Sequence, residues 1–159
     1  MTQSRDFRKG ATRRSRHRQG APRWLWALID NGLRRGTVGH NRFGEDLMSR
    51  VSYAMLHPEG AAEMTSAVRG ALDGLVTALV AAGGVPVERV LALTIVGNPI
   101  MHHLVLGIDP VPLGSAPFAL ATDAAVRTTA HDLGIDAAPG ARVYLLPCIA
   151  GHVGADTAG

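Results

Sequence analysis

The sequence predicts an α/β fold for its C-terminal three quarters. Residues 89–96 (RVLALTIV) and 142–146 (RVYLL) are short runs, rich in β-branched or aromatic residues, that are apolar at nearly every position. Between and before them, apolar residues recur at helical spacing, most clearly over residues 61–82. Short apolar strands that alternate with amphipathic helices are typical of a parallel or mixed sheet with flanking helices.

Three helices are expected before and between the two strands. The first begins after Arg42, with Glu45 and Asp46 in the first turn, where the helix dipole favours negative charge. The second spans about residues 61–82 and ends at Gly83-Gly84. A short third helix is predicted over residues 100–106, directly after the turn Gly97-Asn98-Pro99. The expected apolar stripe of the second helix is Val68, Leu72, Leu75, Val76, Leu79 and Val80.

The two strands are expected to be buried on both faces, because each is apolar at almost every position. Residues 107–121 carry five prolines or glycines and are predicted to be loop, and residues 122–133 are predicted to hold a short helix. Two strands are too few for a closed sheet. Either further strands come from the N-terminal region, or the domain is incomplete.

The charge of the chain is divided unevenly. Residues 1–40 hold ten Arg or Lys and two Asp, a balance of +8, whereas residues 41–159 hold six Arg and eleven acidic residues, a balance of −5. Residues 1–23 contain almost no apolar side chain and are expected to be disordered or non-native. We therefore divide the chain into a basic extension, 1–40, and an α/β region, 41–159. The extension lacks interleaved aromatics, so specific nucleic-acid binding is not expected.

Composition excludes several classes of protein. No apolar run approaches the roughly 20 residues that span a bilayer, and no secretory signal follows the N-terminal basic residues. The single cysteine, Cys148, excludes an internal disulfide framework and fits a reducing compartment. A cytoplasmic protein without membrane partners is predicted.

Two glycine-containing turns are the candidate binding segments. Gly97 and Asn98 follow a predicted strand and precede a helix, where α/β folds place ligand contacts, although a plain strand-to-helix turn explains them equally well. Gly151 and Gly154 would allow close approach of a phosphate, and Asp156 would coordinate Mg²⁺ or cap a helix. Neither segment matches the P-loop or the GxGxxG fingerprint.

A metal site and a nucleophilic site are both poorly supported. His102, His103, Cys148 and His152 are metal-ligand types, but adjacent helical histidines point about 100° apart, so packing or capping is the favoured role. Nothing positions a base beside Cys148, which is expected to be a buried inert thiol. No catalytic residue and no metal ligand is assigned.

Three ordered stretches carry a specific resemblance. They are residues 42–50 (RFGEDLMSR), residues 96–118 (from VGNPIMHHL to GSAPF) and residues 145–157 (LLPCIAGHVGADT). Their order and spacing resemble the middle region of the reductive activators of corrinoid proteins, over about three quarters of the chain. That resemblance implies that the region forms part of a ribonuclease-H-like or actin-like ATPase subdomain. This ATPase fold is shared by acetate kinase, sugar kinases, Hsp70 and actin.

The resemblance implies an activity that the chain is not expected to perform alone. The family reduces Co(II) corrinoid on a partner protein to Co(I), using a [2Fe–2S] cluster and ATP with magnesium. The four cluster cysteines and the two phosphate loops of the family have no counterpart in this sequence. No cofactor is therefore expected for the chain alone, and a truncated fragment, able to form homodimers, is inferred.

Six residues are placed nearest the interdomain cleft on position alone: Gly97, Asn98, His102, Gly151, Gly154 and Asp156. The alternative hypothesis is a small non-enzymatic α/β binding module whose basic arm docks nucleic acid or a protein partner.

Overall fold

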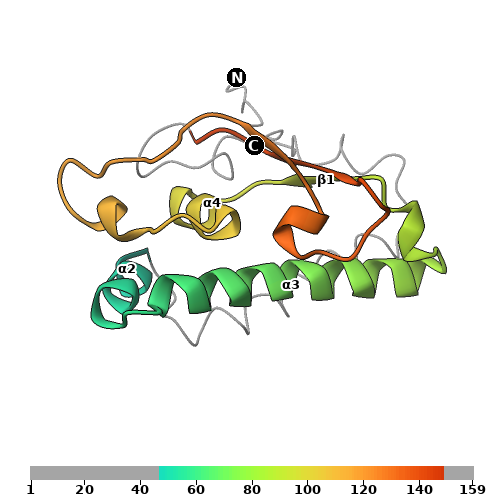
Figure 1. Cartoon of the computed structure of the whole chain (residues 1–159), viewed down its shortest axis with the longest axis horizontal. Coiled ribbons are helices and arrows are strands. Elements are labelled where there is room, and N and C mark those ends of the chain that lie inside the picture. The colour runs from blue at the N-terminus through green and yellow to red at the C-terminus, as the bar shows by residue number, and fades with distance from the viewer. Residues whose placement is uncertain (1–46, 149–159) are drawn as a thin grey trace, which may run out of the picture.

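The computed structural model describes residues 47–148, which form a layer of helices against one face of a small sheet (Figure 1). The α-helices are α2 (Leu47–Leu56), α3 (Gly60–Gly83) and α4 (Pro99–Leu106), and the strands are β1 (Ala92–Ile95), β2 (Val126–Thr129) and β3 (Arg142–Leu145). Three short 3₁₀ turns connect them: η2 (Val87–Arg89), η3 (Val111–Gly114) and η4 (His131–Leu133). The predicted N-terminal extension, Glu45 and Asp46 lie outside the described residues.

Helix α3 runs the length of the domain and ends as its sequence predicts. Gly84 adopts a left-handed conformation at φ 59°. Its N–H donates to the Ala81 carbonyl, and the N–H of Val85 donates to the Val80 carbonyl. A glycine reaches this conformation without the steric cost of a Cβ, so the pair Gly83-Gly84 stops the helix. The opposite end is joined to α2 by the Tyr53 hydroxyl, which donates to the Glu63 carboxylate at 2.8 Å.

The three strands form one mixed sheet in the order β1-β3-β2. Strand β3 lies in the middle, parallel to β1 and antiparallel to β2. The backbone N–H of Arg142 donates to Leu91 and that of Leu146 donates to Ile95, which fixes the parallel register at both ends of β1. Because β1 and β3 run in the same direction, their carboxyl ends meet at one edge of the sheet.

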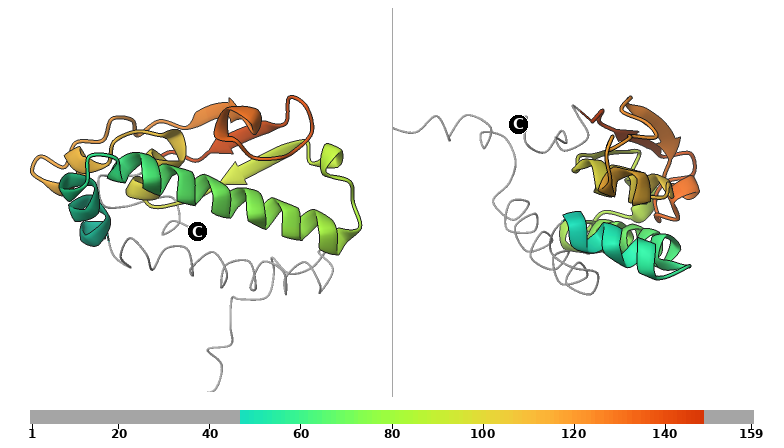
Figure 2. Two further views of the ribbon diagram at one scale, coloured as in Figure 1. Left: turned by 60° about the horizontal axis from the view of Figure 1, so that its bottom comes forward. Right: turned by 90° about the vertical axis from the view of Figure 1, so that its left-hand side faces the viewer.

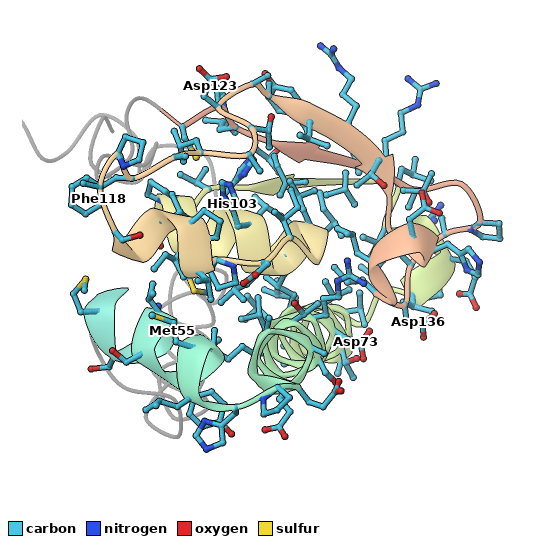
Figure 3. The ribbon with its side chains drawn as sticks, turned by 60° about the vertical axis from the view of Figure 1, so that its left-hand side comes forward. Met55, Asp73, His103, Phe118, Asp123 and Asp136 are labelled. Carbon is cyan, nitrogen blue, oxygen red and sulfur yellow. The ribbon has the colours of Figure 1, made fainter. Side chains whose placement is uncertain are left out.

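The core lies between the sheet and α3, with α4 inserted at the carboxyl edge (Figure 2). Ile100 and Leu104 of α4, and Val143 and Leu145 of β3, are almost entirely excluded from solvent. Helix α3 is further fastened at its middle, because the N–H of Asp136 donates to the Asp73 carboxylate at 2.7 Å (Figure 3). The predicted α/β class with a mixed sheet and flanking helices is therefore confirmed.

The predicted burial of the first strand on both faces is wrong. Strand β1 is shorter than residues 89–96 and alternates exposed and half-buried positions, with Ala92 and Thr94 exposed. The reason is that no element of residues 47–148 covers the outer face of the sheet (Figure 2). A run of apolar side chains at successive positions thus does not by itself show that both faces of a strand are covered.

The short helix predicted within residues 122–133 is also wrong. Strand β2 occupies Val126–Thr129 and pairs with β3, while η4 takes up only residues 131–133. The segment contains Val126, Thr128 and Thr129, whose β-branched side chains favour a pleated strand. Their pairing with β3 outweighs the helical preference of the neighbouring alanines.

Helix α3 has the length and composition of a membrane-spanning helix, with a mean hydropathy of 1.2 over its most apolar 18 residues. One such helix is weak evidence for a membrane span. Met64, Val68 and Val76 are buried against the rest of the domain, and Arg69 and Asp73 make hydrogen bonds to other elements. These contacts indicate that α3 packs as a helix of a folded domain.

Candidate functional site

The residues of the turn between β1 and α4 start helix α4. Asn98 is the N-cap of α4, and its Oδ1 accepts the Met101 N–H at 2.9 Å, while Pro99 occupies the first helical position. These are preferred helix-start residues because they satisfy or remove backbone donors that have no helical partner. At Gly97 a Cβ would come within 3.2 Å of the Met101 Cβ. Tight turn packing therefore explains both residues.

A small, partly open cavity of about 120 Å³ lies beside this turn, at the carboxyl ends of β1 and β3. Gly97 and His102 both line it, so the structure brings two of the predicted site residues together. Most of the wall is aliphatic, including Leu72, Ile95 and Leu145. His102 is only 4% exposed, and neither ring nitrogen has a hydrogen-bond partner within the described part of the chain. An unpaired buried polar group of this kind costs stability.

Both ring nitrogens of the neighbouring His103 have hydrogen-bond partners within the domain. Its Nε2 accepts the backbone N–H of Ala121 at 3.1 Å, which places the ring proton on Nδ1, and Nδ1 lies 2.8 Å from the carbonyl of Pro99. The ring thus joins α4 to the segment ahead of β2 (Figure 3). The His102 and His103 rings are tilted by 58° with centroids 5.9 Å apart. Because both nitrogens of His103 are occupied, the two histidines do not form a joint metal site.

Burial lowers the pKa of His102 below its usual 6.5, and the neighbouring His103 lowers it further. In the native state this ring therefore stays neutral to a lower pH than in the unfolded chain, which takes up a proton as the pH falls through 6.5. Stability that is present above pH 6.5 must be lost as the pH falls toward the lowered pKa.

We predict that His102→Gln weakens the pH dependence of unfolding between pH 7 and pH 5.5. One proton accounts for a slope of at most about 1.4 kcal/mol per pH unit. Urea titrations at several pH values measure the slope, with His131→Gln as the matched exposed control. An identical slope in wild type and His102→Gln would show that His102 titrates normally.

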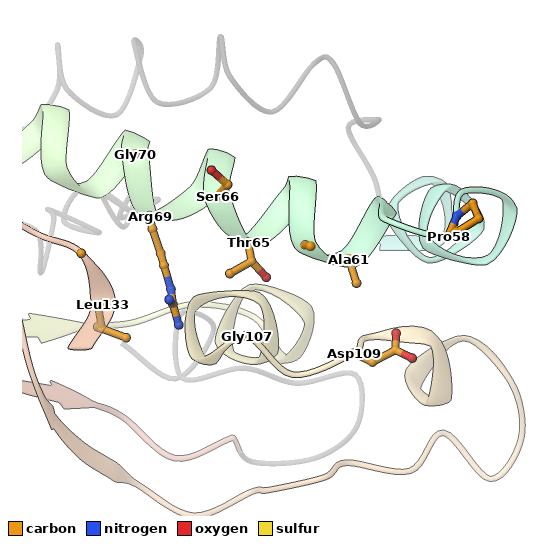
Figure 4. Close-up of a pocket in the computed structure, with 11 residues that line it drawn as sticks. Pro58, Ala61, Thr65, Ser66, Arg69, Gly70, Gly107, Asp109 and Leu133 are labelled. Carbon is orange, nitrogen blue, oxygen red and sulfur yellow. The ribbon is translucent and has the colours of Figure 1, made fainter. Parts of the chain in front are cut away.

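A second, larger depression of about 760 Å³ follows α3 and the residues after α4 (Figure 4). Thr65, Ser66 and Asp109 supply polar side chains along it. Arg69 also reaches into it, but its Nε–H donates to the carbonyl of Val105 at 2.9 Å, in the last turn of α4. A cation at this end of a helix satisfies a free carbonyl and offsets the negative pole of the helix. The groove is therefore a helix junction with no convergent catalytic groups among its described residues.

The remaining predicted site residues, Gly151, Gly154 and Asp156, lie outside the described residues, as does His152. Cys148 is buried as predicted. The residues that sequence reasoning missed are Arg127, Arg142 and Tyr144, which project from the outer face of the sheet. The alternation of Arg142 and Tyr144 with the core residues Val143 and Leu145 was the available signal for that face.

Comparison with known proteins identifies the family of this fold. Residues 38–159, more than half of the chain, match the sequence profile of the family described as the RACo middle region. The chain belongs to the RACo middle region family. It is 30% identical over 115 residues to the corrinoid activation enzyme RamQ of Eubacterium limosum. In structure it resembles a reductive activator for corrinoid, iron-sulfur protein, with a TM-score of 0.69 and 32% identity.

The RACo middle region in this chain corresponds to a minor part of each relative. The match with RamQ covers 72% of this chain and 19% of RamQ, and the structural match covers 73% of this chain and 18% of the activator. The predicted resemblance to corrinoid-protein activators is thus confirmed at the level of the family. The activity of the whole relatives is a separate question.

Proposed function

We propose that this RACo middle region is a structural region of an ATP-dependent reductive activator of corrinoid proteins, within an actin-like ATPase subdomain. Its part in the reduction of Co(II) to Co(I) is to hold elements in place around the reacting centres. The observation that carries the proposal is the match of fold and sequence together: a TM-score of 0.69 at 32% identity over 73% of the chain. The corrinoid protein is the proposed partner, and the cytoplasm the proposed location.

The iron–sulfur cluster of such an activator does not fit this chain. A [2Fe–2S] cluster is held by four thiolates, whereas the sequence contains Cys148 alone, and that thiol is buried. Within residues 47–148, no three His, Cys, Asp or Glu side chains gather as a metal site. We therefore assign electron transfer to residues outside this region.

Nucleotide binding is likewise proposed to depend on phosphate loops outside this region. Asn98, the residue best placed at a helix N-terminus, already uses its Oδ1 for the Met101 N–H. The cavity beside His102 is aliphatic and, at about 120 Å³, far smaller than the roughly 300–1,000 Å³ typical of a ligand pocket. The contribution of Gly97, Asn98 and His102 is therefore to fix the β1–α4 edge, against which other parts of an activator would close.

A chimera tests this proposal. We would replace the segment of RamQ that aligns with this chain by the corresponding residues of this chain, and follow Co(II) corrinoid reduction by visible absorption, with ATP and a reductant. We expect the chimera to reduce the corrinoid at a rate within about tenfold of that of RamQ. A tenfold lower rate corresponds to an activation free energy only about 1.4 kcal/mol higher. The chain alone should give no reduction. A folded chimera without reduction above that background would contradict the proposal.

A further inference from the structure

The outer face of the sheet carries a compact polar surface, which we call the arginine face. Strand register places its residues in two rows, Ala92–Arg142–Thr129 and Thr94–Tyr144–Arg127. Alternate residues of the same strands, such as Val143 and Leu145, point to the core instead. The arginine face borders a hollow of about 550 Å³.

Exposure of this face is unusual for the type of sheet that forms it. Strands β1 and β3 are parallel, and parallel strands are normally covered on both faces. Here the helices lie on one side only, and no described element crosses the other (Figure 2). A partner that covers the arginine face would complete the usual three-layer arrangement.

The charge of the face defines the chemistry of that partner. Arg127 is opposite Tyr144, and Arg142 is two residues before Tyr144 on the same strand, so the two arginines are diagonal neighbours on one surface. The residues that line the hollow include no carboxylate. The nearby Asp132 carboxylate is already bonded to the hydroxyls of Thr128 and Thr129, at 3.1 and 2.7 Å. Hydroxyl donors favour the ionised carboxylate, so Asp132 remains one negative charge beside the two arginines. The arginine face therefore has a net positive charge among the described residues.

We propose that the arginine face is a docking surface for an acidic surface of a separate protein. A guanidinium presents a planar fork of donors that matches a carboxylate, and arginine and tyrosine are among the residues most enriched at binding hot spots. Arg127 lies over the Tyr144 ring with its Cζ 5.3 Å from the centroid, which holds the guanidinium in place before binding. This ordering reduces the entropy lost on association.

The contact between Arg127 and the Tyr144 ring argues against nucleic acid as the partner. Proteins that bind single strands on a sheet stack bases on free aromatic rings. Tyr144 is the single aromatic side chain of the arginine face, and one side of its ring is occupied by Arg127. Two cations also neutralise few phosphates.

Binding of poly-L-glutamate by the full-length chain tests the proposal. The double variant Arg127→Gln/Arg142→Gln removes two charges from the face, and Arg13→Gln/Arg14→Gln removes two from the basic extension as a matched control. We expect the Arg127→Gln/Arg142→Gln variant to raise the Kd for poly-L-glutamate at low salt by tenfold or more, because hydrogen bonds to charged groups are lost. The control variant should raise the Kd less. Arg142→Gln alone, which leaves the Arg127–Tyr144 contact intact, should give part of the loss.

Three results would overturn the proposal: absence of poly-L-glutamate binding, an equal or larger loss in the control variant, or a greater loss for duplex DNA than for poly-L-glutamate in the face variant. The last would assign the face to nucleic acid. The interface goes beyond the proposed function and does not depend on it. Because poly-L-glutamate carries no corrinoid, failure here leaves the RamQ chimera result unaffected.

Discussion

Replacing Leu104 by alanine is expected to lower the free energy of unfolding by about 2–5 kcal/mol. Leu104 lies on α4, is 1% exposed and belongs to the core that α4 shares with α3 and the sheet. Removing three carbons leaves a cavity that the surrounding helices and strands cannot fully close. Urea unfolding followed by circular dichroism measures the change.

Leu91→Ala is the matched control, because the same side-chain atoms are removed from a position that is 70% exposed. A change within about 0.5 kcal/mol is expected there, as for most surface substitutions. Equal losses in the two variants would show that α4 does not hold the core together.

A methyl group at Gly60 is expected to destabilise the domain by about 1–3 kcal/mol. Gly60 begins α3 and is buried against the end of α2. An added Cβ would lie 2.9 Å from the carbonyl oxygen of Tyr53 and 3.1 Å from the Ala54 Cα. These are backbone atoms, so Gly60→Ala can be accommodated only if α2 and α3 move apart.

Gly74→Ala tests the same change in the same helix without that obstacle. No atom lies within 4 Å of the position that its Cβ would take. The substitution should stabilise the chain by about 0.5–1 kcal/mol, since alanine loses less backbone entropy in a helix than glycine does. Thermal melts of both variants give the comparison, and stabilisation by Gly60→Ala would contradict the close α2–α3 approach.

Local sequence signals predicted the helices well and the sheet only in part. The spacing of Val68 and Val76, with Gly83-Gly84 behind them, located α3 to within a residue or two. Strand β2 was not predicted although three of its four residues are β-branched, because so short a run does not by itself indicate a strand. The pairing with β3 that forms the strand is a contact between distant segments. The open face of β1 was missed for a similar reason, since coverage of a sheet depends on elements elsewhere in the fold.

The candidate site was predictable in position but not in role. Gly97 and His102 do lie together at the carboxyl edge of the sheet, as strand–turn–helix order implied. Their chemistry could not be predicted in the same way. The Asn98 side chain caps α4. His102 has no hydrogen-bond partner among residues 47–148, whereas His103 accepts a hydrogen bond from Ala121, 18 residues further along the chain, which no local pattern predicts.

Family membership and activity remain distinct results for this chain. The RACo middle region match covers residues 38–159, yet the aligned part is 19% of RamQ. We therefore expect this region to substitute for its counterpart in an activator and not to reduce a corrinoid alone.

Corrinoid reduction by the RamQ chimera tests this account most directly. Rates should be measured for RamQ, the chimera, the chimera carrying Leu104→Ala, and the isolated chain, each with and without ATP. We expect an ATP-dependent rate for the chimera within about tenfold of RamQ, a loss of folded protein with Leu104→Ala, and no reduction by the chain alone. A folded but inactive chimera, or reduction by the isolated chain, would contradict it.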